Sequence, residues 1–161
     1  IDSIFAAGDV TGEPMTANLA MEQARIAGIA AAGHEVRPSR PGSLVEAAYT
    51  HPQVAQVGVT PEAAENGRAG LAVAPVQLDE LLQPMVENDG ATPGGFLRLV
   101  YDRRDDGRLV GATAFGRRAA DLLAPVALAV REALPLDSLA GRLAGHPTLS
   151  EAAFIAACDV E

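Results

Sequence analysis

Near the end of the chain, the segment HPTLSE places the ring of His146 five residues before the carboxylate of Glu151. A residue that precedes proline is held out of helical geometry, so we expect His146 to lie just before a helix that begins near Glu151. A carboxylate beside an imidazole fixes the tautomer of the ring and raises its affinity for a proton. The pair could therefore act as a general acid and base near neutral pH.

The same letters also fit a capping box, in which Thr148 caps the helix and Glu151 occupies its third position. Thr148 or Ser150 can supply the cap, and His146 is then merely packed. Because caps are common and catalytic pairs are rare, the residues alone favour the cap over the acid/base pair.

Another carboxylate, Asp9, follows the apolar run at residues 4–6 and Gly8. We expect that run to be a buried strand, at whose carboxyl end Asp9 could bind ligand hydroxyls or cap the next turn; the residues alone favour capping. Pro14 suits the first turn of a following helix. Small residues recur through that helix and indicate close packing on a sheet: Ala17, Ala20, Ala24, Ala27 and Ala31.

A strand, a turn and a helix N-terminus together make a binding corner of the α/β type, which favours negative charge. Only one such strand and helix occur here, and the chain opens on Ile1 without Met. We therefore expect residues 1–36 to be the end of a domain whose beginning lies upstream. Prolines and Gly42 then break every period and predict a linker at residues 37–42.

From Ser43 onward the pattern predicts strands at 45–49, 54–59 and 71–78, and a helix at 61–65 that Thr60 caps and Gly67 ends. Pro75 lacks a donor and places the third of these strands at an edge. Two β-rich runs surround Asp106 and Gly107, which tolerate a tight hairpin turn.

A helix follows at residues 117–134, in which Pro125 should cause a kink or a restart, and two shorter helical stretches flank His146. Strands grouped first and helices grouped last indicate an α+β fold, with an antiparallel sheet of about four or five strands and helices packed on it.

Composition limits the function. The chain has 161 residues, about one domain or one domain with part of another, and its core must be mostly Ala, Leu and Val because it has no Trp. A net charge of −9 disfavours nucleic acid, and no apolar run is long enough to span a membrane. The lone Cys158 and the absence of clustered Cys and His favour a reducing cytoplasm and no metal site.

Five segments in series resemble the flavin-dependent pyridine nucleotide-disulfide oxidoreductases: IFAAGDVTG, PMTANLAMEQARIAG, YTHPQVAQVGVT, GFLRLVYD with RLVGATAFG, and HPTLSEAAFIAA. Dihydrolipoamide dehydrogenase, glutathione reductase, mercuric reductase and soluble transhydrogenase belong to that family. The resemblance covers nearly the whole chain but only the family's C-terminal third. It implies that residues 1–36 are the tail of the FAD-binding domain and residues 43–161 the dimerisation domain of a homodimer.

The resemblance also assigns site residues. It implies that Asp9 binds the ribityl hydroxyls of FAD, and that the backbone of Met15, Thr16, Ala17 and Asn18 approaches the flavin ring. Asn18 stands where many members have His. It implies further that His146 and Glu151 are the acid/base pair that serves the other subunit's active site.

The implied function is that of a C-terminal part of an FAD- and NAD(P)H-dependent oxidoreductase acting on disulfides or dithiols. A Gly-rich dinucleotide loop and a redox-active cysteine pair do not occur in the chain, so we expect it to be inactive alone. Two alternatives stay open. In the first, the chain is a stand-alone dimerisation or binding module without catalysis. In the second, its parent protein is a mercuric reductase or a transhydrogenase.

Overall fold

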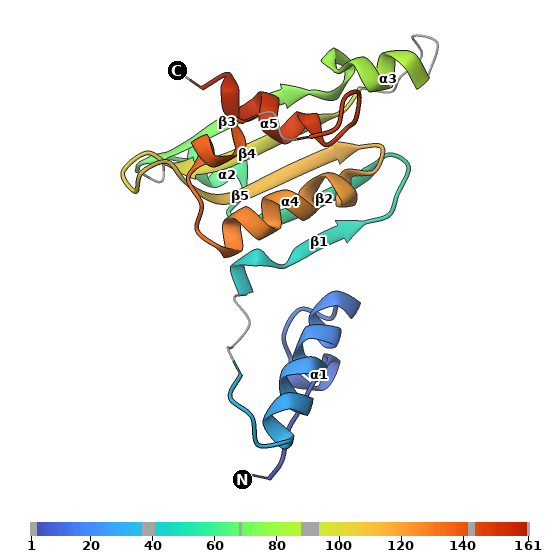
Figure 1. Ribbon diagram of the computed structural model, residues 1–161, viewed down its shortest axis with the longest axis vertical. Helices are drawn as coiled ribbons and strands as arrows, with labels where there is room; N and C mark the ends of the chain where they lie inside the picture. The colour runs from blue at the N-terminus through green and yellow to red at the C-terminus, as the bar shows by residue number, and fades with distance from the viewer. Residues whose placement is uncertain (1–2, 37–40, 68, 88–93, 142–143, 161) are drawn as a thin grey trace.

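The computed structural model describes residues 3–36, 41–67, 69–87, 94–141 and 144–160. In this part of the chain, one N-terminal helix precedes a five-stranded antiparallel sheet with helices (Figure 1). The elements are α1 (Ala17–Ala31), β1 (Val45–Ala48), β2 (Gln53–Gly58), α2 (Pro61–Glu65), β3 (Leu71–Gln77), α3 (Leu82–Glu87), β4 (Phe96–Asp102), β5 (Arg108–Gly116), α4 (Ala119–Arg131) and α5 (Glu151–Cys158). Short 3-10 turns lie at Asp9–Thr11, Pro41–Ser43, Leu78–Glu80 and Leu136–Leu139. The expected α+β class is confirmed.

The sheet has the order β1-β2-β5-β4-β3, so β1 and β3 are its edges. The expected edge position of Pro75 in β3 is confirmed, and there its missing N–H removes no bond from an inner ladder. The β4–β5 hairpin turns where expected, with positive φ at Asp106 and Gly107. Strands that follow each other in the chain and pair in the sheet, such as β1 with β2 and β4 with β5, run antiparallel. Antiparallel strands can be joined by short connections.

The core lies between the sheet and the layer of α4 and α5, which Figure 1 shows on the near face of the sheet with α2 behind. Small residues let these layers approach closely, as composition predicts, and Tyr101 is the one aromatic among the buried residues that the structure describes. The largest fully buried side chains are Leu97, Leu99, Leu109, Leu123, Val57, Val100, Val126 and Pro61.

The N-terminal unit differs from the expected strand and helix. Residues 4–7 form no strand, because no neighbouring strand in the described ranges pairs with them, and Ile4 and Phe5 are exposed. The helix itself is present as α1, but Pro14 precedes its N-cap, Thr16, instead of lying in the first turn. None of the residues of α1 is buried. Such a helix lacks the packed face that its small residues indicate.

The linker, the helix around Pro125 and the segment after β3 each differ in part from the expectation. Residues 37–40 of the expected linker lie outside the described residues, and Pro41–Ser43 form a 3-10 turn. The helix expected to restart at Pro125 does not: α4 continues through it as one α-helix, and a bend of its axis stays a prediction. The pattern did not predict α3, a short helix that follows the 3-10 turn after β3.

Candidate functional site

The loop between the 3-10 turn Leu136–Leu139 and α5 carries His146, just before the helix, as expected. The peptide bond from His146 to Pro147 is cis. Ser150 is the N-cap of α5 and makes no side-chain cap hydrogen bond, so Glu151 is the first helical residue. The chain thus turns once between the imidazole and the carboxylate.

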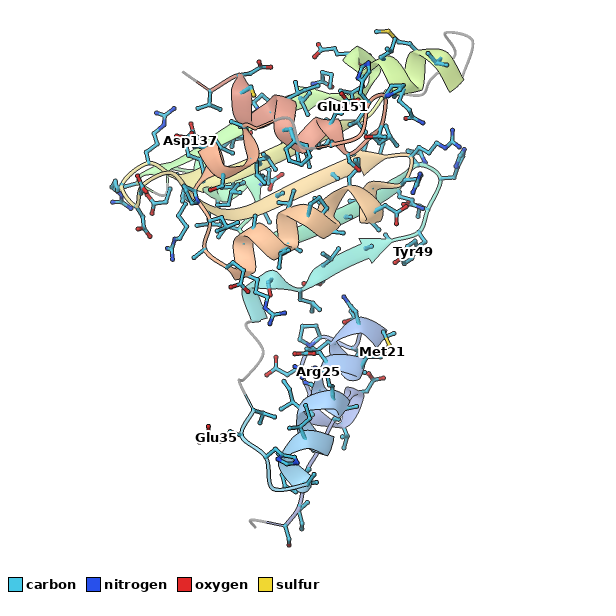
Figure 2. The ribbon with its side chains drawn as sticks, viewed as in Figure 1. Met21, Arg25, Glu35, Tyr49, Asp137 and Glu151 are labelled. Atoms are coloured by element: carbon cyan, nitrogen blue, oxygen red, sulfur yellow. The ribbon has the colours of Figure 1, made fainter. Side chains whose placement is uncertain are left out.

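This turn brings His146 and Glu151 into contact. The Nδ1 atom of His146 lies 2.9 Å from Oε1 of Glu151. The other carboxylate oxygen, Oε2, accepts a hydrogen bond of 2.8 Å from the backbone N–H of Thr148. The carboxylate of Glu151 therefore contacts both the imidazole ring of His146 and the backbone N–H of Thr148. Figure 2 shows Glu151 at the beginning of α5.

The contact of Glu151 with the N–H of Thr148 is one half of a capping box. The other half is missing, since the hydroxyl of Thr148 donates to the carbonyl of Gly145 at 2.7 Å instead of accepting from the helix. The two interpretations of HPTLSE are thus not exclusive: the same carboxylate caps the turn and contacts the imidazole.

The two side chains differ in exposure. Glu151 is mostly covered, with 20% of its side chain exposed, whereas 64% of the His146 side chain is exposed. An ionised carboxylate only accepts hydrogen bonds, so this contact requires the proton on Nδ1 and leaves Nε2 as the basic nitrogen. The geometry gives a ring that is fixed on one side and open on the other.

At the N-terminal end, Asp9 opens the 3-10 turn Asp9–Thr11 and is exposed. The expected cap is not observed, because the turn has Gly8 at its N-cap and no side-chain cap bond. Instead, Gln23 of α1 accepts the N–H of Gly8 at 2.7 Å and donates to the hydroxyl of Thr11 at 3.2 Å. Sequence reasoning missed Gln23, since a lone glutamine within a helix carries no local signal.

The start of α1 has donors without partners. Within the described residues, the backbone N–H groups of Ala17 and Asn18 have no acceptor, as expected for a first helical turn. The N–H of Thr16 is occupied by the carbonyl of Pro14 at 2.8 Å, and its Oγ1 is buried without a partner. Met15 is exposed. Backbone N–H groups without an acceptor therefore lie next to an exposed apolar side chain.

The two groups of residues lie apart in the chain's own fold. α5 contacts β3 and β4, whereas Asn18 of α1 contacts β1 at the opposite edge of the sheet. Five strands spaced at about 4.8 Å put these edges about 19 Å apart. Among the residues that the structure describes, no three His, Cys, Asp or Glu gather as a metal site, and no helix is long and apolar enough to cross a membrane.

Comparison with known proteins identifies the fold. Residues 45–157 match the family model of the pyridine nucleotide-disulphide oxidoreductase dimerisation domain. The chain belongs to this family. The matched residues include all five strands of the sheet and α4, and the match ends within α5.

Curated relatives extend the match to nearly the whole chain. Dihydrolipoyl dehydrogenase 2 of Haloarcula marismortui is 36% identical over 160 residues, which are 97% of this chain and 32% of that protein. Dihydrolipoyl dehydrogenase of Chlorobaculum tepidum is 35% identical over 156 residues, with the same coverage. The chain thus spans about a third of the length of the curated relatives it matches.

Solved structures agree. The crystal structure of LpdA from Mycobacterium tuberculosis superposes with a TM-score of 0.84 at 31% identity, over 96% of this chain and 33% of that one. The copper(II) complex of a cysteine-to-serine mutant of the flavoprotein disulfide reductase RclA from Escherichia coli gives a TM-score of 0.85 at 24% identity, over 99% of this chain and 36% of that one. The second likeness bears on the fold alone.

Proposed function

We propose that this chain supplies the dimerisation domain, and the end of the FAD-binding domain, of a homodimeric flavin- and NAD(P)H-dependent oxidoreductase that acts on disulfides or dithiols. Residues 1–36 form the flavin-domain tail and residues 43–161 the dimerisation domain, with 37–42 between them. The observation that carries the proposal is the 2.9 Å contact between His146 and Glu151, in a chain of this family.

The pair suits proton exchange with a thiol. Glu151 holds Nδ1 protonated and turns the exposed side of the ring, with Nε2, toward a substrate. Nε2 takes the proton of a thiol to generate a thiolate, and the imidazolium that forms is stabilised by the carboxylate behind it. Glu151 is a positioning residue in this scheme, and His146 is the catalytic residue.

The separation between His146 and the flavin segment of the same chain supports a homodimer. His146 lies on the side of the sheet away from the edge that Asn18 contacts, so it does not serve the flavin segment of its own chain. A second copy related by a two-fold axis can bring one chain's His146 to the other chain's flavin segment. Each active site would then contain residues of both subunits.

The start of α1 fits a flavin. The free N–H groups of Ala17 and Asn18 and the positive end of the helix favour negative charge, and the buried Oγ1 of Thr16 lacks a partner. Met15 offers an apolar surface, and the exposed Asp9 can accept hydrogen bonds from ribityl hydroxyls. When bound, FAD would supply the electron transfer between NAD(P)H and the disulfide.

The names of the relatives leave more than one substrate. Besides dihydrolipoyl dehydrogenases they include a NAD(P)H dehydrogenase (quinone) of Mycobacterium tuberculosis, 32% identical over 151 residues, which are 91% of this chain and 29% of that protein. We favour thiol chemistry because a quinone does not need a base that removes a thiol proton. The chain alone is inactive in this proposal, since it carries neither a dinucleotide loop nor a cysteine pair.

The test is the substitution His146→Gln in the complete flavoprotein that contains this chain. We expect dithiol turnover to fall by about 10²–10⁴-fold while FAD stays bound, because only the proton transfer is removed. Unchanged dithiol turnover would refute the acid/base role. Normal quinone reduction by the variant, beside a lost dithiol reaction, would show that the pair serves thiols alone.

A further inference from the structure

The position of α1 relative to the dimerisation domain must be fixed by something other than burial, because none of the residues of α1 is buried. Packing therefore does not hold this helix against the dimerisation domain. One side chain bridges the two: the amide Nδ2 of Asn18 donates a hydrogen bond of 2.8 Å to the carbonyl oxygen of Val45. We propose that Asn18 is a positioning residue, whose side chain docks the start of α1 on the first strand of the dimerisation domain and not on the flavin.

The acceptor suits this role. Val45 is the first residue of β1, an edge strand, and edge strands present carbonyl oxygens that no neighbouring strand uses. Its partner in the ladder, Val57, is fully buried in the core. Since a carbonyl oxygen only accepts, Asn18 must turn its NH2 group toward β1. The helix start is thereby tied to backbone that the core holds in place.

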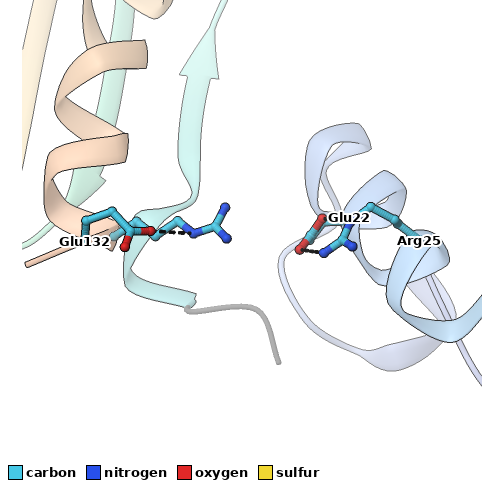
Figure 3. A network of polar contacts seen from close by, with 4 residues as sticks. Glu22, Arg25 and Glu132 are labelled. Carbon is cyan, nitrogen blue, oxygen red and sulfur yellow. Dashed lines mark hydrogen bonds and ion pairs between the residues drawn. The ribbon is translucent and has the colours of Figure 1, made fainter. Parts of the chain in front are cut away.

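A second observation puts the same face of α1 toward the dimerisation domain. Glu22 lies one turn after Asn18, and its pKa is lowered first by the hydrogen bond from Arg25 and also by the charge of Arg131. Arg131 ends α4 and pairs with Glu132 at 3.4 Å (Figure 3). Residues four apart share a helix face, so Asn18 and Glu22 both point to this part of the domain.

The consequence rests on the proposed function. If the backbone of Met15 to Asn18 meets the flavin, the Asn18 side chain sets where that backbone lies relative to the sheet that carries His146. The amide of Asn18 and an imidazole place a nitrogen at the same distance from Cα, so a histidine N–H can replace the donor. Alanine cannot.

The experiment measures the distance between α1 and α4 in this chain. Spin labels are attached at Ala31→Cys and Ala124→Cys, both exposed positions, in a Cys158→Ser background, and the labelled chain is mixed with an excess of unlabelled chain so that a dimer carries only one labelled copy. We expect Asn18→Ala to broaden the distance distribution at least about twofold, and Asn18→His to keep it narrow. Asn66→Ala, the same change at the exposed end of α2, is the matched control and leaves the distribution unchanged. Alanine is the better helix former, so melting of α1 does not explain a broadening.

A distance distribution that stays narrow in Asn18→Ala would overturn the proposal. A distribution that is as broad in Asn18→His as in Asn18→Ala would overturn it as well. In the complete flavoprotein, loss of one such bond should weaken FAD binding by about fivefold, with Asn18→His restoring it; an unchanged Kd would exclude the positioning role. The distances are measured without flavin. If the complete protein binds no FAD even with Asn18 in place, the proposed function fails and the docking result still stands.

Discussion

His146 and Glu151 are joined across a single turn of chain, with 2.9 Å between Nδ1 and Oε1. The same carboxylate accepts the N–H of Thr148 through its second oxygen at 2.8 Å. Orienting the ring and starting α5 are thus two tasks of one side chain. A change at Glu151 should affect both, whereas a change at His146 should leave the helix start intact.

Glu151→Gln should weaken both the contact with the ring and the start of α5. The two hydrogen bonds end on different oxygens, and glutamine turns one of these oxygens into an NH2 group that only donates, so one of the two bonds is lost. We therefore expect dithiol turnover in the complete flavoprotein to fall by about 10²-fold. The free energy of unfolding should fall by about 1 kcal/mol, because a negative charge at a helix N-terminus is lost. Steady-state kinetics and urea unfolding measure the two effects.

Ser150→Ala is the matched control for Glu151→Gln. Ser150 is the N-cap of α5 but makes no side-chain cap hydrogen bond, so its loss should change stability by less than about 0.5 kcal/mol and leave turnover unaltered. A loss of turnover equal to that of Glu151→Gln would show that the helix start, and not the carboxylate, governs the rate.

Local chemistry made several features predictable. Pro75 has no N–H to donate, and that property alone assigns β3 to an edge. Asp106 and Gly107 tolerate positive φ, which a tight hairpin requires. The spacing of His146 and Glu151 allowed their contact because the proline and the helix start lie between them.

Features that depend on distant segments were not predictable in the same way. Residues 4–7 have the composition of a buried strand, but within the described residues no strand pairs with them, so composition alone misassigned them. The bond from Asn18 to Val45 joins residues 27 positions apart and has no sequence signature. At Pro125, the packing of Leu122, Leu123 and Val126 in the core outweighs the missing hydrogen bond and keeps α4 continuous.

Leu123→Ala should be strongly destabilising. Leu123 of α4 is fully buried against the sheet, and truncation of such a side chain costs about 2–5 kcal/mol through lost burial and a cavity. Leu128→Ala makes the same change in the same helix at a side chain that is 58% exposed, and should cost less than about 1 kcal/mol. Urea unfolding followed by circular dichroism compares them; equal losses would contradict the placement of α4.

Two glycines should respond oppositely to alanine. A Cβ atom on Gly111 of β5 would lie 2.1 Å from the carbonyl oxygen of Val59, so Gly111→Ala should cost about 1–3 kcal/mol or more. Gly28 lies within α1 with nothing near its Cβ position, and Gly28→Ala should raise the helicity of α1. Thermal unfolding and far-ultraviolet circular dichroism test the pair, and a harmless Gly111→Ala would contradict the close β2–β5 approach.

The chain should form a dimer in solution. Exposed apolar side chains remain on α3 and beside β1, among them Met85, Val86 and Tyr49, and a dimerisation domain has a surface made for a second copy. Sedimentation equilibrium should therefore give twice the chain mass of 16.5 kDa at micromolar concentration. A monomer at all concentrations would count against the homodimer.

Glu22 should titrate below its ordinary pKa of 4.5, chiefly because Arg25 donates hydrogen bonds to its carboxylate. Arg25→Ala should therefore raise the pKa of Glu22 more than any other single change. Arg131→Ala should raise it by a smaller amount, because the charge of Arg131 acts across the space between α4 and α1. Proton–carbon NMR titration of the Glu22 side chain measures both shifts. Arg117→Ala, a charge removed from the other end of α4, should leave the pKa unchanged; an equal response to Arg117 and Arg131 would mean that α1 does not face the end of α4.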